Sequence, residues 1–391
     1  MEDRIRELLR SAPLVDGHND MVWALRQARE KDGREPDVSQ ACPQLQTDLP
    51  RLRAGGVGAQ FWSVYVPSDL PPERAVTMTL EQIDALYELV RRFPDRLELA
   101  RTAEDVERVA AAGKVASMIG VEGGHCIGNS LGTLRILARL GAGYLTLTHN
   151  DDTPWADSGT GDHPHGGMTR FGEEVVRELN RCGVLVDLSH VSEDTMRQAI
   201  EVSEAPVIFS HSSARALCDV VRNVPDDVLE RIGRTGGVVM VTFVPAFVAP
   251  EGAEVSRAAW AKVRELRAEH AGDPEAARAA IDAWWASIEQ VPATIAQVAD
   301  HIDHVRAVAG IDNIGVGGDF DGADTMPTGL EDVSGYPSLF AELTARGYTD
   351  EDLRKIAGRN VLRVMREAER VAARLQRERP PSAAAMEPAD G

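Results

Sequence analysis

Short apolar runs recur along the chain, and stretches with the apolar spacing of helices separate them. Several runs, such as VLVDL and VVMVTFV, are almost continuously apolar. Strands that are buried on both faces, as in a parallel sheet covered by helices, have this composition. We predict strands at Leu14–His18, Val57–Val66, Val115–Glu122, Tyr144–Thr148, Val184–His190, Val207–His211, Val238–Val244 and Ile314–Asp319.

The segments between these runs have the periodicity of amphipathic helices. Ser192, followed by two acidic residues, is typical of a helix N-cap. Gly141 and Gly183 stand where a helix should end before the next strand. We predict helices at Glu81–Arg92, Ala103–Ala112, Thr133–Leu140, Gly172–Arg181, Ser192–Val202 and Asp226–Arg234.

Eight strands that alternate with helices predict an α/β protein with a (β/α)8 barrel of the TIM type. A doubly wound parallel sheet is the alternative, but its usual GxGxxG motif after the first strand is absent. The glycine cluster at Gly55–Gly58 precedes a strand instead of opening a helix, so we interpret it as a turn.

The span Val255–Ala309, between the seventh and eighth predicted strands, is longer than one crossover requires. Its alanines and charges predict two or three helices inserted beside the barrel, with Trp284 and Trp285 as packing residues. A further helix is expected after Val361, to about Arg377. We therefore expect one domain over residues 1–378 and a disordered tail over 379–391.

The composition excludes several classes of partner. With 42 Lys+Arg against 62 Asp+Glu, the formal net charge of -20 repels nucleic-acid phosphates. The four cysteines (Cys42, Cys126, Cys182 and Cys218) form no CxxC pair and predict neither a disulfide framework nor a zinc ribbon. The N-terminus has the pattern of an amphipathic helix, and the apolar segment Gly236–Pro250 is too short to span a bilayer. We expect a cytoplasmic protein with no nucleic-acid or membrane partner.

Candidate chemistry gathers where the predicted strands end. Six strands close in motifs that contain His, Asp or Glu: DGHND at 16–20, EGGH at 122–125, THN at 148–150, DLSH at 187–190, SHSS at 210–213 and GDFD at 318–321. In a parallel barrel these ends all lie on one face, where the following loops build the active site. Six such motifs together predict a functional site there.

Metal binding is the chemistry that suits these residue types. His18 and Asp20 are two apart on an extended segment, so both can face one ion. His190 and His211 come from adjacent strands and can hold a second ion, while Glu122 can bridge the two. Imidazole with carboxylate suits zinc, with manganese, cobalt or iron as alternatives. Two ions that share a water make hydroxide available at neutral pH.

The other histidines favour structural or surface roles. His163 and His165 form an HxH in a Gly/Asp/Pro-rich loop with no strand beneath, which argues against a ligand role. His301 and His304 fall on a helical pattern flanked by acids, and we predict that they lie on a solvated face. Cys126, beside His125, is interpreted as a buried, inert thiol.

Two further choices concern charged residues near the strand ends. Asp319 ends the eighth predicted strand and is predicted to be the catalytic carboxylate, whereas Asp321 lies further into the loop and is predicted to order it. Arg215 and Arg222 follow the sixth strand. Either guanidinium can bind an anionic substrate group or pair with a surface acid.

The segments LVDGHND, GVEGGH, LTHN, VDLSH, FSHSSAR and GVGGDFDG, in this order, resemble the renal (membrane) dipeptidase family of the amidohydrolase superfamily. The resemblance extends from about Leu14 to Arg363 and implies a (β/α)8 barrel with two Zn²⁺ ions. It assigns His18 and Asp20 to one zinc, His190 and His211 to the other, and Glu122 to both.

The resemblance also implies the remaining roles. His149 matches a residue that contacts the substrate carbonyl, Arg222 one that binds the C-terminal carboxylate, and Asp319 one that moves protons. A binuclear zinc dipeptidase follows, in which a zinc-activated hydroxide cleaves free L-X–L-X and L-X–D-X dipeptides. A homodimer is also implied.

Other readings stay open from sequence. A different amidohydrolase reaction, such as deacylation of N-acyl amino acids or lactone opening, can use the same metals. A binding barrel without catalysis and a structural scaffold are further alternatives. The loop Asp151–Thr169 and the long insertion leave the substrate range open.

Overall fold

A closed ring of parallel strands forms the centre of the protein. The structure is a computed structural model that describes residues 2–288 and 291–386. The ring runs β1, β2, β4, β5, β6, β7, β8 and β9, and the pairing of Asp16 in β1 with Val316 in β9 closes it. The strands are β1 (Leu14–Asn19), β2 (Val57–Tyr65), β4 (Val115–Glu122), β5 (Ala142–Thr146), β6 (Leu185–Asp187), β7 (Ile208–Phe209), β8 (Val238–Val241) and β9 (Ile314–Val316). The predicted (β/α)8 barrel is confirmed, and each of its eight strands overlaps a predicted run.

One further strand lies outside the ring. β3 (Leu97–Leu99) pairs only with the first residues of β4, whose later residues pair with β5. The sequence analysis missed β3 because three residues carry too little periodicity to be recognised.

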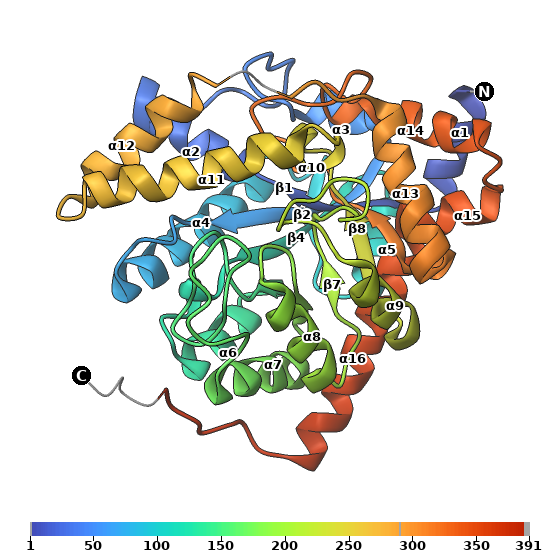
Figure 1. The fold of residues 1–391 in the computed structure, drawn as a ribbon. Coiled ribbons are helices and arrows are strands. Elements are labelled where there is room, and N and C mark those ends of the chain that lie inside the picture. The colour runs from blue at the N-terminus through green and yellow to red at the C-terminus, as the bar shows by residue number, and fades with distance from the viewer. Residues whose placement is uncertain (1, 289–290, 387–391) are drawn as a thin grey trace.

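Helices surround the barrel (Figure 1). Those that follow the predicted pattern are α4 (Pro72–Arg92), α5 (Ala103–Ala111), α6 (Leu131–Arg139), α7 (Arg170–Cys182), α8 (Glu193–Val202) and α9 (Asp226–Thr235). Ser192 caps α8 by accepting a hydrogen bond from the Thr195 amide, as its sequence context indicates. Gly183 ends α7 in the left-handed conformation, with φ of 75°. Among the described residues, three α-helices precede α4: α1 (Glu2–Ser11), α2 (Met21–Asp32) and α3 (Leu49–Gly55). Three follow β9: α14 (Tyr336–Ala345), α15 (Asp350–Arg354) and α16 (Asn360–Glu378).

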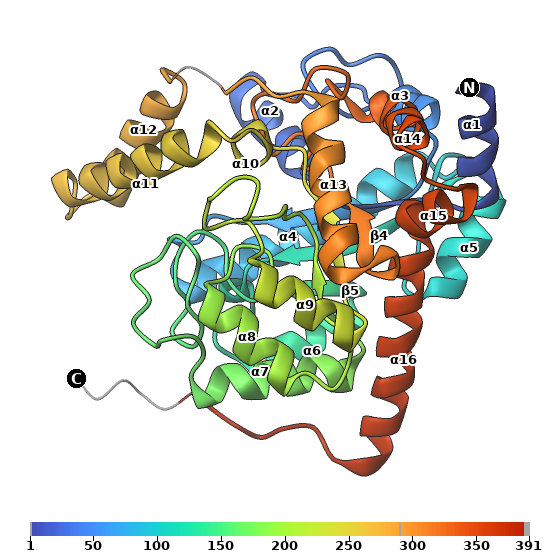
Figure 2. The same cartoon turned by 45° about the vertical axis from the view of Figure 1, so that its right-hand side comes forward.

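The chain between β8 and β9 forms four helices: α10 (Pro245–Val248), α11 (Gly252–Glu269), α12 (Pro274–Trp285) and α13 (Ile295–Ala309). α13 packs on α9 and α14 and buries Val298, Ile302 and Val305, so it serves as the crossover helix of the barrel. α11 and α12 pack mainly on each other and on α10, and they project from the barrel in Figure 2. Trp285 packs edge-on against both Trp260 and Trp284 within this helix pair.

His301 corrects one expectation. Its side chain is fully buried under α13 instead of lying on a solvated face. Nδ1 accepts a hydrogen bond from the Ala214 amide at 3.0 Å, and Nε2 lies 3.1 Å from the Val248 carbonyl oxygen. The prediction was wrong because it assigned α13 to the insertion, whereas this helix covers the loops after β7 and β8. His304, one turn further on, is partly exposed and lies 2.7 Å from Asp226 Oδ1.

The C-terminal residues run back along the barrel. Beyond α16, residues 380–386 form no helix or strand. The Ser382 amide donates to Glu178 on α7 at 3.1 Å, and the Ser382 hydroxyl donates to Glu174 at 2.8 Å. Within the described residues, no helix is both long enough and apolar enough to cross a membrane.

Glycines let side chains near the strand ends approach the barrel axis. A Cβ at Gly17 would lie 2.3 Å from the Ser210 carbonyl oxygen, and one at Gly120 would lie 2.2 Å from the ring of Tyr144. Gly120 on β4 therefore gives the Tyr144 ring on β5 the space in which to reach inward. These close approaches hold the neighbouring strands in position and thereby position the residues at the strand ends.

The buried His301 predicts a pH-dependent loss of stability. Burial lowers its pKa from an ordinary 6.5 to about 4, so the unfolded chain binds the proton first as the pH falls. The stabilisation is present above about pH 6.5 and is lost between about pH 6.5 and 4. Between pH 7.5 and 5, the wild-type advantage over His301→Gln in free energy of unfolding should shrink by about 2 kcal/mol, measured by urea unfolding. His163→Gln removes an exposed imidazole and serves as the control; a constant wild-type advantage would contradict the buried neutral state.

Candidate metal centre and active site

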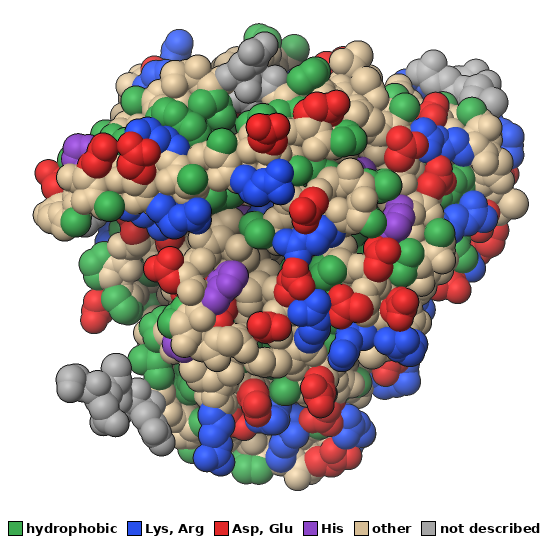
Figure 3. Space-filling view, viewed as in Figure 1, with side chains coloured by type: hydrophobic (Ala, Val, Ile, Leu, Met, Phe, Trp, Pro, Cys, Tyr) green, Lys and Arg blue, Asp and Glu red, His purple; other side chains and the backbone are tan. Residues whose placement is uncertain are grey.

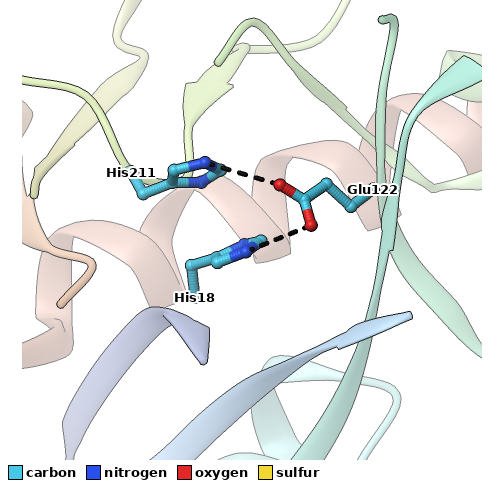
Figure 4. Close-up of side chains that lie close together, drawn as sticks. All are labelled: His18, Glu122 and His211. Atoms are coloured by element: carbon cyan, nitrogen blue, oxygen red, sulfur yellow. Dashed lines mark ion pairs between the residues drawn. The ribbon is translucent and has the colours of Figure 1, made fainter. Parts of the chain in front are cut away.

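One carboxylate stands at the centre of the histidine cluster. Glu122 ends β4, and its two oxygens face different imidazoles (Figure 4). Oε2 lies 3.4 Å from His18 Nε2, whereas Oε1 lies 3.7 Å from His211 Nε2 and 3.1 Å from His190 Nε2. His149 Nε2 is also 3.7 Å from Oε1. The Glu122 carboxylate therefore lies between the histidines that the sequence analysis assigns to the metals.

Two further carboxylates lie on the side of the histidine cluster nearest β1 and β9. His18 Nε2 lies 3.2 Å from Asp20 Oδ2 and 3.9 Å from Asp319 Oδ1. His18, Asp20 and Asp319 therefore form one group of possible metal ligands, and His18, Glu122 and His211 form another. A third group consists of Glu122, His149 and His190. Every residue that the sequence assigns to the metals belongs to at least one group.

The hydrogen bonds behind two histidines fix their tautomers. His190 Nδ1 lies 3.2 Å from the Asn150 amide oxygen, which only accepts, so Nδ1 carries the proton. The Ser210 hydroxyl donates to Asp187 Oδ2 at 2.6 Å, so it must accept from His211 Nδ1, 2.8 Å away. Both Nε2 atoms are then left with lone pairs.

Those two lone pairs point at the same space. His190 Nε2 and His211 Nε2 are 2.9 Å apart, with no proton to share between them. His18 Nε2 is buried and forms no hydrogen bond within the described part of the chain, although three carboxylates lie within 3.9 Å of it. Imidazole lone pairs gathered around a shared carboxylate are the donor set of a zinc-type site, so the residues present fit divalent metal ions.

The supporting residues were not assigned a role by the sequence analysis. Tyr144 places its hydroxyl 2.8 Å from His18 Nδ1. Asp187, at the end of β6, accepts from the Ser189 and Ser210 amides at 3.1 and 2.8 Å, and from the Thr146 hydroxyl at 2.6 Å. Asp187 lies in the VDLSH motif, so this motif was the sequence signal that could have identified it. No sequence signal pointed to Tyr144.

Asp16 supports the opposite side of the centre. Its Oδ1 accepts hydrogen bonds from the amides of His18 at 3.1 Å and Gly318 at 3.0 Å. It thereby joins the end of β1 to the loop that carries Asp319. Burial raises the pKa of Asp16 to about 6, and its hydrogen bonds oppose that rise.

Burial keeps three of the histidines neutral. It lowers the pKa of His149 to about 4 and holds the pKa values of His190 and His211 well below the ordinary range. Burial disfavours the charged form of Glu122, but the neighbouring His18 and the other imidazoles outweigh it and lower the pKa of Glu122. Burial also disfavours the charged form of His18, but the nearby Tyr144, Glu122 and Asp20 outweigh it and raise the pKa of His18 well above the ordinary range. The Glu122 anion therefore attracts positive charge.

Asp319 occupies a different environment. Burial, together with the charges of Asp20 and Glu122, raises the pKa of Asp319 to about 7 against the opposing effect of His18. Its backbone is left-handed, with φ of 61°, and so is that of His190, with φ of 71°. Residues with a Cβ adopt this conformation only where the surroundings impose it, and such residues cluster at functional sites.

The two arginines differ in what they contact. Arg222 is 2% exposed, and its Nη1 has no hydrogen-bond partner among the described residues. Its guanidinium lies 5.3 Å from the centre of the Phe247 ring, and burial lowers its pKa to about 10. Arg215 instead pairs with Glu193 and lies 3.5 Å from Asp219. Arg222 is therefore the guanidinium available to an anion.

The remaining candidates lie away from the cluster. His163 is exposed, and His165 Nε2 lies 3.1 Å from the Thr153 carbonyl oxygen, so neither joins a group of possible ligands. Asp321 accepts from the Gln46 amide at 2.7 Å and so orders its loop, as predicted. Cys126 is buried next to His125, whose Nε2 lies 2.9 Å from the Val66 carbonyl oxygen.

A parallel barrel that gathers histidines and carboxylates at its strand ends defines a metal-dependent hydrolase of the amidohydrolase type. A family model described as membrane dipeptidase (peptidase family M19) matches residues 2–379. The chain belongs to this family of metallo-dipeptidases, as its sequence motifs predict.

Solved structures agree with this assignment. The probable dipeptidase PvdM from Pseudomonas aeruginosa has a TM-score of 0.80 and 26% identity, covering 95% of this chain and 99% of that one. A metallopeptidase from Rhodobacter sphaeroides, liganded with a phosphinate mimic of the dipeptide L-Ala-D-Ala, has a TM-score of 0.74 and 26% identity, covering 91% and 99%. A structure described as dipeptidase AC, a metallopeptidase, has a TM-score of 0.75 and 27% identity, covering 91% and 98%.

A substitution of Tyr144 tests whether the residues that contact the candidate ligands contribute to metal binding. Tyr144→Phe removes the hydroxyl that faces His18 Nδ1 but leaves the ring over Gly120. Loss of such a partner typically weakens metal binding about 10- to 100-fold. We expect a weakening of about tenfold in zinc affinity, measured by competition with a chromogenic chelator. Tyr87→Phe, on α4 outside the barrel, is the matched control; equal affinities of the two variants would contradict the role of Tyr144.

Proposed function

We propose that this protein is a binuclear zinc dipeptidase that hydrolyses free dipeptides, both L-X–L-X and L-X–D-X. The observation that carries the proposal is the convergence of two features. Imidazole lone pairs of His190 and His211 meet beside the Glu122 carboxylate. The buried Arg222 guanidinium, whose Nη1 has no hydrogen-bond partner among the described residues, lies close enough to Asp319 and Glu122 for their charges to act on it.

The ligand set follows from the grouping of side chains. His18 and Asp20 would hold one ion, His190 and His211 the other, and Glu122 would bridge them. When bound, two zinc ions would polarise the scissile carbonyl and supply a nucleophilic hydroxide at neutral pH.

Arg222 determines how the substrate lies. Its guanidinium fork matches a carboxylate, and the low polarity of its surroundings strengthens the attraction. A substrate whose C-terminal carboxylate binds Arg222 presents the adjacent peptide bond to the histidine cluster. This arrangement favours peptides that end one residue beyond the cleaved bond.

His149 and Asp319 act on the reacting atoms. His149 is neutral at pH 7 and can donate one N–H hydrogen bond to the carbonyl oxygen as negative charge develops on it. Asp319 accepts a proton from the attacking water and delivers it to the leaving amine. A carboxyl with a raised pKa can perform both transfers near neutral pH.

The tolerance for a D-residue at the C-terminal position rests on similarity. The Rhodobacter sphaeroides metallopeptidase, at 26% identity, holds a mimic of L-Ala-D-Ala. We extend that preference to this chain as part of the proposal.

The proposal is tested by measuring metal content together with a small substrate panel. We expect about two zinc equivalents per chain, cleavage of L-Ala–L-Ala and L-Ala–D-Ala, and no cleavage of their C-terminal amides. Arg222→Met should lower kcat/KM for the free dipeptides roughly 100-fold, since a charged hydrogen bond contributes about 1.5–3 kcal/mol. Two equivalents of zinc without any dipeptide cleavage would move the activity to another amidohydrolase substrate.

Asp319→Asn tests proton transfer separately from metal binding. The amide keeps the shape of the side chain but cannot accept a proton from water. We expect unchanged zinc content and a fall in kcat of about 10²- to 10⁴-fold, measured with L-Ala–D-Ala. A variant that keeps its zinc and turns over at the wild-type rate would rule out the proposed role.

A further inference from the structure

The two helices that project from the barrel, α11 and α12, are attached to loops beside the candidate active site. Arg267, in the last turn of α11, pairs with Asp151, and its Nη2 lies 3.3 Å from Asp151 Oδ2. Arg278 on α12 contacts both oxygens of Asp69 at 2.6 Å. We call this pair of helices, residues 252–285, the hairpin.

Both partners belong to loops at the carboxyl ends of barrel strands. Asp69 follows β2, and Asp151 follows β5, two residues after His149. The Ser68 hydroxyl also donates to Asp151 Oδ2, so the two loops are joined to each other as well as to the hairpin. The arrowhead of β2 points to the side on which the hairpin lies (Figure 1), and the hairpin forms a charged ridge above a recessed part of this face (Figure 3).

The order of strands around the barrel shows which end of a substrate this attachment faces. Arg222 lies in the loop after β7, and in the ring of eight strands β7 is four places from β2. Strands four places apart lie on opposite sides of an eight-stranded barrel. A peptide whose C-terminal carboxylate binds Arg222 therefore extends across the histidine cluster toward the loop of Asp69.

We propose that the hairpin, held by the Arg267–Asp151 and Arg278–Asp69 ion pairs, closes the site on the side of the substrate's N-terminus and so restricts cleavage to dipeptides. The inference rests on the proposed function and assigns to these four residues the discrimination against longer peptides. An additional residue at the N-terminus of the substrate would have to displace the attached loops or the hairpin.

The attachment is strong enough to shift a population but not to lock the hairpin permanently. α11 buries Ala259, Val263 and Leu266, whereas in α12 Ala277 is the buried hydrophobic residue among those whose exposure is described. The side chains of Arg267 and Arg278 are 46% and 42% exposed, so each ion pair is partly screened by water. Each pair then contributes a several-fold preference for the closed arrangement, and salt should weaken both.

The experiment compares the hydrolysis of L-Ala–L-Ala with release of the C-terminal alanine from L-Ala–L-Ala–L-Ala. The double variant Arg267→Ala/Arg278→Ala should raise the tripeptide-to-dipeptide ratio of kcat/KM about three- to tenfold. The matched control is Arg264→Ala, an exposed residue of the same helix that forms no ion pair within the described residues. The charge exchange Asp69→Arg/Arg278→Asp keeps both ion pairs, one of them with its charges reversed, and should give a ratio close to that of the wild type.

Two further measurements test the ion pairs in other ways: the first varies the salt concentration, and the second does not depend on turnover. Raising NaCl from 0.05 to 0.5 M should increase the ratio for the wild type but not for the double variant. Amide hydrogen exchange over residues 252–285 should be faster in the double variant and unchanged in Arg264→Ala. If the double variant keeps its zinc content and the wild-type ratio, the hairpin does not set substrate length. Absence of dipeptide cleavage in the zinc-loaded wild type would instead overturn the proposed function and this inference together.

Discussion

The attraction between one buried carboxylate and the imidazoles around it is the interaction on which the active site depends. Glu122 has four Nε2 atoms within 3.7 Å and only 4% of its surface exposed. A buried anion is costly unless positive charge lies close to it, and of these four imidazoles only that of His18 has a pKa raised well above the ordinary range. Divalent cations held by His190 and His211, whose pKa values burial keeps well below the ordinary range, would add positive charge next to Glu122.

Two aspartates connect the strand ends that carry this histidine cluster. Asp16 ties the end of β1 to the loop after β9, and Asp187 ties the ends of β5, β6 and β7 together through hydroxyls and amides. Each accepts hydrogen bonds from backbone amides that parallel pairing leaves without partners where the strands end. The same bonds orient the histidines next to them, so barrel closure and ligand geometry share one network.

The sequence predicted what depends on local pattern. The ends of the strands can be recognised in the sequence, because the apolar runs stop at His, Asp or Glu. This pattern was enough to predict the barrel and the side chains that meet at Glu122. It could not predict Tyr144, because that contact depends on how β5 lies beside β4 and on the space left by Gly120. His301 was misplaced for a related reason: α13 resembles a surface helix in its acids, and only its packing against the loops after β7 and β8 shows it to be buried.

The spread of the site along the chain has a consequence for folding. Its residues run from His18 in β1 to Asp319 just after β9, so the group of His18, Asp20 and Asp319 exists only once the last strand has paired with the first. A chain still emerging from the ribosome carries the histidine pair at 190 and 211 long before this group can form. Contacts between such distant parts of the sequence form late, because closing long loops is entropically unfavourable. The complete set of candidate ligands therefore comes together only when β9 has paired with β1 and closed the barrel.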